Sequence, residues 1–115
     1  KDATETTCDT GCAGWRDESG ERTEILELRR KSGVIAALLY SWLDFAVFDP
    51  SAGITLYARG SKVVIRGRNL NAGMNTRGAL FQGIIHHRVL WIRESERSED
   101  LTASESGTFI ESIAW

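Results

Sequence analysis

Basic and aromatic side chains gather in the middle of the chain, within a segment whose apolar and other residues alternate as in the strands of a β-hairpin. Lysine ammonium and arginine guanidinium groups bind phosphates, and a tyrosine ring can stack on a nucleic-acid base. If the residues that alternate with the apolar ones share one sheet face, they form a surface for an anionic partner. The alternative is a solvated face, or a charge layer that meets the acidic ends of the same chain or of a second copy. The candidate residues for nucleic-acid contact are Tyr57, Arg59, Lys62, Arg66 and Arg68.

Residues suited to catalysis are few. Asp44 and Asp49 are the only carboxylates between residues 28 and 93, and a five-residue separation along one strand places them on opposite faces. His86 or His87 could meet a serine, but no serine lies in the strand–turn–helix setting of a nucleophile. We therefore expect no catalytic residues and no enzyme activity. A small hydrolase-like enzyme that uses His86 or His87 is the alternative.

The cysteines and glycines give no pattern typical of a metal or cofactor site. A disulfide between Cys8 and Cys12 would close a very short loop, and zinc would need two further ligands. The two adjacent histidines are poorly placed to supply them. The glycines lack the strand–loop–helix phosphate fingerprint. We expect no metal and no cofactor, and the oxidation state of the cysteines stays open.

Charge is segregated along the 115 residues, although the net charge is only -2. Residues 28–93 hold ten Lys or Arg against two Asp, whereas residues 1–27 and 94–115 are acidic. Such a distribution favours an anionic partner for the middle, or ends that fold back and neutralise it. The longest apolar run, Val34–Leu39, is too short to cross a bilayer, so we expect a cytoplasmic protein without a membrane partner.

Two hairpins organise this middle segment. A β-rich run at 24–30 and an apolar run at 34–40 flank Lys31-Ser32-Gly33, which indicates a turn. A helix over Val34–Phe48 is the competing interpretation. A strand at 42–48 ends at Asp49-Pro50-Ser51-Ala52-Gly53. Ile54–Arg59 and Lys62–Arg66 then form the second hairpin around Gly60-Ser61, with one apolar and one basic face.

A helix is expected late in the chain. Asn71 is a good cap for a helix over 72–87, and Met74, Phe81 and Ile85 share one stripe that should cover the sheet, widened by Leu80 and Ile84. A strand over 88–93 follows.

Three segments follow from this division. Residues 1–22 are expected to be a flexible acidic leader, 23–93 a single domain, and 94–115 an acidic linker with a terminal strand. Trp42 and Trp91 lie in apolar strands and should be core, whereas Trp15 and Trp115 near the ends indicate contact with another chain.

Four stretches between Leu39 and Ser95 resemble small hypothetical bacterial proteins of unassigned function. They are Tyr-Ser-Trp-Leu-Asp-Phe at 40–45, Asp-Pro-Ser-Ala-Gly-Ile-Thr-Leu at 49–56, Val-Ile-Arg-Gly-Arg-Asn-Leu at 64–70 and His-His-Arg-Val-Leu-Trp-Ile-Arg at 86–93. The five-strand meander with a helix is also similar to Sm-like or SH3-like small barrels, a resemblance that implies RNA binding or ring assembly, although the usual Sm order places the helix first.

The fold class expected is mainly β (α+β): an antiparallel five- to six-stranded bent meander or small barrel with one helix in the C-terminal half. The expected function is a non-enzymatic binding or assembly module, a homo-oligomer that uses its terminal segments or an open sheet edge. Nucleic-acid binding, to RNA or DNA, through the basic sheet face is the alternative.

Overall fold

The computed structural model describes residues 7–9, 12–16, 22–71, 79–96 and 108–115. These residues form mostly strands and one short helix, α2, so the mainly β class with a helix in the C-terminal half is confirmed. No helix among them is long and apolar enough to cross a membrane. The elements in chain order are β1 (Thr7–Asp9), β2 (Ala13–Arg16), β3 (Ile25–Arg29), β4 (Ile35–Leu39), the 3₁₀ turn η1 (Tyr40–Trp42), β5 (Leu43–Asp49), β6 (Gly53–Ala58), β7 (Ser61–Arg68), α2 (Leu80–Ile85), β8 (Val89–Arg93) and β9 (Phe109–Ala114).

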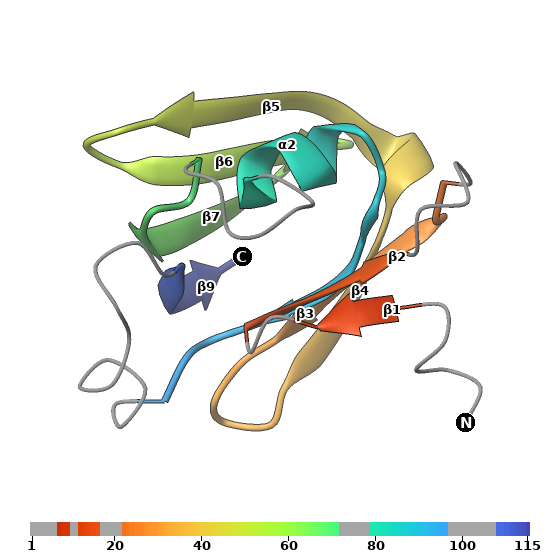
Figure 1. Ribbon diagram of the computed structural model, residues 1–115. Coiled ribbons are helices and arrows are strands. Elements are labelled where there is room, and N and C mark those ends of the chain that lie inside the picture. The colour runs from red at the N-terminus through yellow and green to blue at the C-terminus, as the bar shows by residue number, and fades with distance from the viewer. Residues whose placement is uncertain (1–6, 10–11, 17–21, 72–78, 97–107) are drawn as a thin grey trace.

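The strands form two open sheets that face each other (Figure 1). The five-stranded sheet has the order β1-β2-β8-β3-β4, and the four-stranded sheet has the order β5-β6-β7-β9. Among the described strands β3 and β8 pair in parallel, whereas the other neighbours are antiparallel. The chain passes from one sheet to the other where β4 runs through η1 into β5, and this produces the expected bend of the meander.

The helical interpretation of Val34–Phe48 is wrong. β4 pairs with β3 over its whole length, from Ile25↔Leu39 to Arg29↔Ile35. Gly33 reverses the chain with a φ of +98°, a backbone conformation that L side chains rarely adopt. Because β3 offers a complete set of backbone partners, the ladder outweighs the helix propensity of the alanines and leucines in this run.

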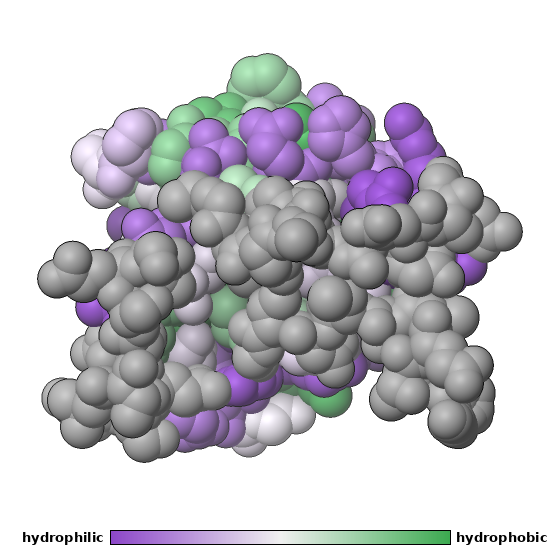
Figure 2. Space-filling model, in the orientation of Figure 1, coloured by the Kyte–Doolittle hydropathy of each residue, from purple (hydrophilic) through white to green (hydrophobic). Residues whose placement is uncertain are grey.

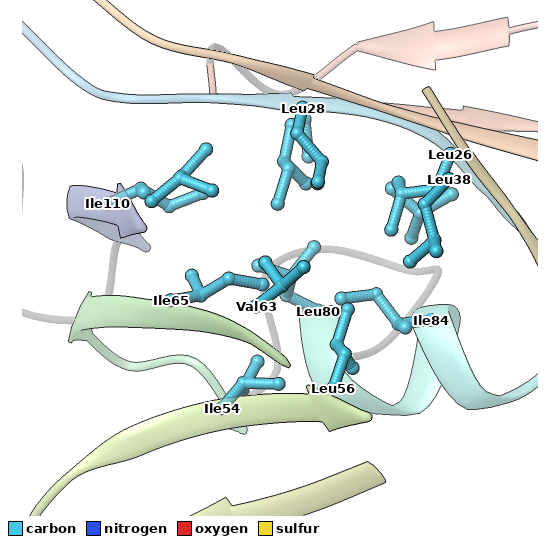
Figure 3. Packing of buried hydrophobic residues seen from close by; sticks show 14 of the residues in the cluster. Leu26, Leu28, Leu38, Ile54, Leu56, Val63, Ile65, Leu80, Ile84 and Ile110 are labelled. Carbon is cyan, nitrogen blue, oxygen red and sulfur yellow. The ribbon is translucent and has the colours of Figure 1, made fainter. Parts of the chain in front are cut away.

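A single hydrophobic core fills the space between the sheets. Leucines from β3 and β4 face isoleucines, a leucine and a valine from β6 and β7, and α2 adds Leu80 and Ile84 at the side (Figure 3). Ile54, Leu56, Ala58, Val63 and Ile65 are buried, whereas Tyr57, Lys62 and Arg66, which alternate with them, are exposed. The alternation expected for this hairpin is therefore confirmed at its apolar face.

The interpretation of residues 1–22 as a flexible leader is wrong for Ala13–Arg16. These residues form β2, which pairs with β8, and Trp15 is only 1% exposed. The ring packs against α2 at Gly83, where an added Cβ would lie 2.5 Å from the indole. Trp15 is thus a core residue and not a contact with another chain, because burying its large apolar surface in this slot stabilises the fold.

The helix differs from the expected one in its face and its end. Leu80 and Ile84 are buried, whereas Phe81 is half-buried and Ile85 is exposed. The packing of Gly83 on Trp15 sets this rotation of the helix. α2 begins at Leu80, so the expected cap Asn71 does not cap it. Met74 and the other residues from 72 to 78 lie outside the described part of the chain.

The helix ends at Ile85, two residues before His87, whose φ is +59°. The backbone N–H of His87 donates to the carbonyl of Ile84, and that of Arg88 donates to the carbonyl of Gly83. These two bonds form a Schellman motif, with a histidine in the place that glycine usually takes.

The C-terminal strand closes the four-stranded sheet, as expected for residues 94–115. β9 pairs with β7, and Glu94 holds it against the other sheet: its carboxylate accepts from the backbone N–H of Lys31 and of Ile113, each at 2.8 Å. The guanidinium of Arg30 lies 3.7 Å from the ring centroid of Trp115. These contacts join the β3–β4 turn to the chain end, while residues 97–107 lie outside the described part.

Candidate functional site

The outward surface of the four-stranded sheet carries most of the residues singled out from the sequence. Tyr57 and Lys62 are directly paired across β6 and β7, and their side chains alternate with buried Leu56 and Val63. Arg66 follows on β7 and is exposed on the same face, opposite Ser112 of β9. Three of the five candidates therefore share one surface, as the alternation predicted.

An exposed phenylalanine joins this surface from β5. Phe45 is the cross-strand partner of Tyr57, with ring centroids 5.9 Å apart and planes inclined by 37°. Phe45 is 62% exposed and Tyr57 40% exposed, so both rings offer an open face to solvent. In Figure 2 hydrophobic side chains stand at the top of the view, where β5 lies in Figure 1.

Arg59 is part of the turn and not of the strand face. The two-residue connection is Arg59-Gly60, one residue earlier than expected, with φ values of +50° and +82°. Both angles are positive, as in the type I′ turns that suit the twist of a hairpin. The backbone N–H of Arg59 donates to the Asp44 carboxylate at 3.1 Å, and its guanidinium lies 4.9 Å from the ring centroid of Trp42.

Trp42 is therefore not a core residue, and that expectation is wrong. It lies in η1, where the chain leaves β4, and it remains 40% exposed beneath Arg59. Trp91 is also not fully buried: it lies half-buried on the outer face of the five-stranded sheet, and the Arg29 guanidinium is 4.4 Å from its centroid. In both cases an arginine guanidinium lies over the ring of a partly exposed indole.

We call the outward surface of the four-stranded sheet that carries these basic and aromatic side chains the aromatic–basic face. It excludes Arg68, which follows a β-bulge between Arg66 and Gly67 and lies over Phe109 at the far end of the sheet, 4.7 Å from that ring. Trp42 and Phe45 were missed from the sequence because the strand expected at 42–48 carries apolar residues on both faces. The members of the aromatic–basic face are Trp42, Phe45, Tyr57, Arg59, Lys62 and Arg66.

The face is basic and open within the described residues. Lys62 and Arg66 are exposed, and neither forms an ion pair with a described carboxylate. The Asp44 carboxylate, beside the turn, accepts from the backbone N–H of Arg59. The surface can therefore offer three cations and three aromatic rings to a partner without first breaking an ion pair to another described residue.

The two histidines lie elsewhere. His87 stacks on Tyr40 with centroids 4.5 Å apart, and both residues line a hollow of about 440 Å³ together with Arg22, Thr23, Glu24, Ile25, Leu39 and Ser41. Burial, the charge of Arg22 and the neighbouring His86 lower the pKa of His87 from its ordinary value of 6.5. No hydrogen bond joins the side chains of His87, Ser41 and Glu24 in the described structure, so the geometry of an activated serine is not formed there.

The tyrosine beneath His87 has a structural role. The Tyr40 hydroxyl donates to the carbonyl of Val89 at 2.8 Å, and burial raises its pKa. Cys12 is also structural: its buried thiol donates to the Thr108 carbonyl at 3.6 Å. Across the described ranges, no group of His, Cys, Asp and Glu side chains is arranged to hold a metal ion.

Comparison with known proteins adds no relative. No family model, no curated protein and no solved structure matches this chain. The resemblance of Leu39–Ser95 to small bacterial proteins and of the meander to Sm-like barrels stays a prediction. Function has to be argued from the aromatic–basic face itself.

Proposed function

We propose that this protein is a non-enzymatic binding module that takes single-stranded nucleic acid on the aromatic–basic face. The observation that supports the proposal is the exposure of Phe45 and Tyr57 as a ring pair beside Lys62. Aromatic rings on an open sheet stack on bases, and flanking cations neutralise the phosphates. The proposal agrees with the cytoplasmic location expected from the sequence.

A single strand fits this surface better than a duplex. Base faces are stacked inside a duplex, so exposed rings on a sheet gain a partner only where bases are unstacked. Neighbouring strands of a sheet lie about 4.8 Å apart, which keeps the rings of Phe45 and Tyr57 close enough to contact adjacent bases. The turn places the Trp42–Arg59 stack at the end of the same sheet as a third platform.

The expected affinity is moderate. Stacking contributes about 1–3 kcal/mol per base, and three cations neutralise at most about three phosphates. The net charge of -2 gives no long-range attraction for a polyanion. Binding therefore depends on local contacts, and log K should fall with log salt with a slope of about -2 for three phosphate contacts on a single strand.

Fluorescence anisotropy tests the proposal. The probes are labelled single strands of about 12 nucleotides, one a uridine and one a thymidine homopolymer, at about 50 mM salt. Replacing Phe45 and Tyr57 by Ser should weaken binding roughly 5- to 150-fold for each base that loses its stack. Trp115→Ser is the matched control, because Trp115 is a similarly exposed ring outside the face.

Charge reversal separates the cations of the face from cations elsewhere. Lys62→Glu or Arg66→Glu should weaken binding and flatten the salt dependence, whereas Lys31→Glu in the exposed β3–β4 turn should not. The proposal is contradicted if neither homopolymer binds at low salt. It is also contradicted if Lys31→Glu weakens binding as much as Lys62→Glu or Arg66→Glu does. Tighter binding of a duplex of the same length rejects the single-stranded preference.

A further inference from the structure

The open edge of β4 differs from the other sheet edges that the structure describes. The sheet edges are formed by β1, β4, β5 and β9. β1 carries Asp9, β5 carries Asp44 and Asp49, and β9 carries Glu111. Charges on an edge strand prevent pairing with another chain. β4, with the sequence Ile-Ala-Ala-Leu-Leu, has no charge and no proline.

The hydrogen-bond pattern shows which backbone groups of β4 are available. The N–H of Arg30 donates to the carbonyl of Val34, and the N–H of Tyr40 donates to the carbonyl of Glu24, each at 2.9 Å. In an antiparallel ladder the bonding residues alternate. The even-numbered residues of this segment therefore bond to β3, and the N–H and C=O groups of Ile35 and Ala37 and the N–H of Leu39 point to the open side. The carbonyl of Leu39, the N-cap residue of η1, accepts the first bond of that turn.

The same residues place apolar side chains on the outer face of the five-stranded sheet. Ile35 is 59% exposed, and Ile25 on the neighbouring strand β3 is 44% exposed. Ile25 is the cross-strand partner of Leu39. Isolated exposed apolar residues are ordinary, but here they lie along a strand edge with unpaired backbone groups, and this combination favours strand addition.

We propose that β4 of one copy pairs antiparallel with β4 of a second copy, and that this edge is a homodimer interface. A two-fold axis at Ala37 sets Ile35 opposite Leu39 of the second copy and forms about four backbone hydrogen bonds. The apolar side chains of Ile25 and Leu39 of one copy then lie next to that of Ile35 of the other copy on the outer face. No like charges meet across the axis, because the strand has none and Glu27 is paired with Arg29 at 2.9 Å.

Self-pairing is favoured over another occupant by this symmetry. The edge is complementary to itself in backbone pattern, side-chain size and charge, whereas an acidic or basic peptide would find no counter-charge on β4. A five-residue edge buries less than the about 1,200 Å² of a stable interface, so the dimer should dissociate on dilution. The interface lies on a different sheet from the aromatic–basic face, so the inference does not depend on the proposed function.

Sedimentation of the full chain without nucleic acid, from about 10 µM to about 1 mM, tests the dimer. The mass should rise from 12.8 kDa toward twice that value with concentration. Ala37→Lys should weaken association at least about tenfold, because it sets two ammonium groups side by side at the axis. Ala114→Lys is the matched control: an exposed alanine on the edge strand β9.

Amide hydrogen exchange locates the interface. The amides of Ala37 and Leu39 should exchange slowly at high concentration and rapidly on dilution, whereas those of Ala36 and Leu38 stay protected at both. Ile35→Thr, which keeps the strand propensity, should also weaken association. A mass of 12.8 kDa at every concentration overturns the proposal. The proposal is also overturned if Ala114→Lys abolishes association while Ala37→Lys keeps it.

Discussion

At the scale of single residues, the neighbours of His87 restrict both its backbone conformation and its protonation. His87 combines a left-handed backbone with a ring stacked on buried Tyr40, and its surroundings disfavour the protonated form. The residue ends α2 and at the same time covers the core next to the hollow. Its protonation should therefore be linked to stability.

We expect the folded protein to lose stability on acidification through His87. The pKa of its ring is below 6.5 in the folded protein, so the unfolded chain takes up the proton first and is stabilised as pH falls through about 6.5. The free energy of unfolding should thus fall from about pH 8 to about pH 5 more steeply in the wild type than in His87→Asn, since Asn tolerates the positive φ but does not titrate.

Urea unfolding at several pH values measures this difference, and NMR titration of the His87 ring gives its pKa directly. A ring titration midpoint at or above the ordinary value of 6.5 would contradict the expected direction.

At the scale of elements, the Glu94 carboxylate joins the C-terminal strand to the β3–β4 turn of the other sheet. Glu94 accepts hydrogen bonds from Lys31 and Ile113, and the adjacent Ser95 exchanges bonds with Ile110: the Ser95 N–H donates to the Ile110 carbonyl, and the Ser95 hydroxyl accepts from the Ile110 N–H. β9 is thereby joined to the segment that leaves β8, and the two sheets are connected at this end.

Glu94→Ala should destabilise the protein by about 2–3 kcal/mol, because two backbone N–H groups lose a charged acceptor. Glu111→Ala on β9 removes an exposed carboxylate and should change the free energy of unfolding by less than about 0.5 kcal/mol. Chemical denaturation monitored by circular dichroism makes the comparison. Equal small effects from both variants would show that Glu94 does not hold β9.

At the scale of the whole molecule, the core depends on contacts between distant parts of the chain. β2 near the start lies beside β8, and Trp15 fills the slot left by Gly83. β9 at the end completes the other sheet. Both terminal strands are therefore parts of the sandwich, and the segment 23–93 does not contain its whole core.

Trp15→Ala should cost about 3–5 kcal/mol, the range for truncating a buried aromatic side chain. Trp115→Ala should cost about 1 kcal/mol or less, because Trp115 is exposed and contacts a single guanidinium. Denaturation curves recorded by circular dichroism give both values. Near-equal values would mean that the N-terminal strand is dispensable for the fold.

Several features of this fold were determined by local sequence alone. The glycine at 33 and the Asp49–Gly53 stop fixed where the chain turns, and alternation assigned Tyr57, Lys62 and Arg66 to one face. These effects are local, because the backbone angle of Gly33, the missing N–H of Pro50 and the two-residue period of a strand each act within a few residues. The mainly β class follows from them.

Other features were decided only by tertiary structure. Trp15 became core because Gly83 leaves room for it, and Trp42 became part of the aromatic–basic face because Arg59, in a turn 17 positions later, covers it. Phe45 lies outward although β5 is apolar on both faces. A short apolar run has the same pattern whichever partner it meets, so burial and exposure at these rings depend on the packing of segments far apart in the chain.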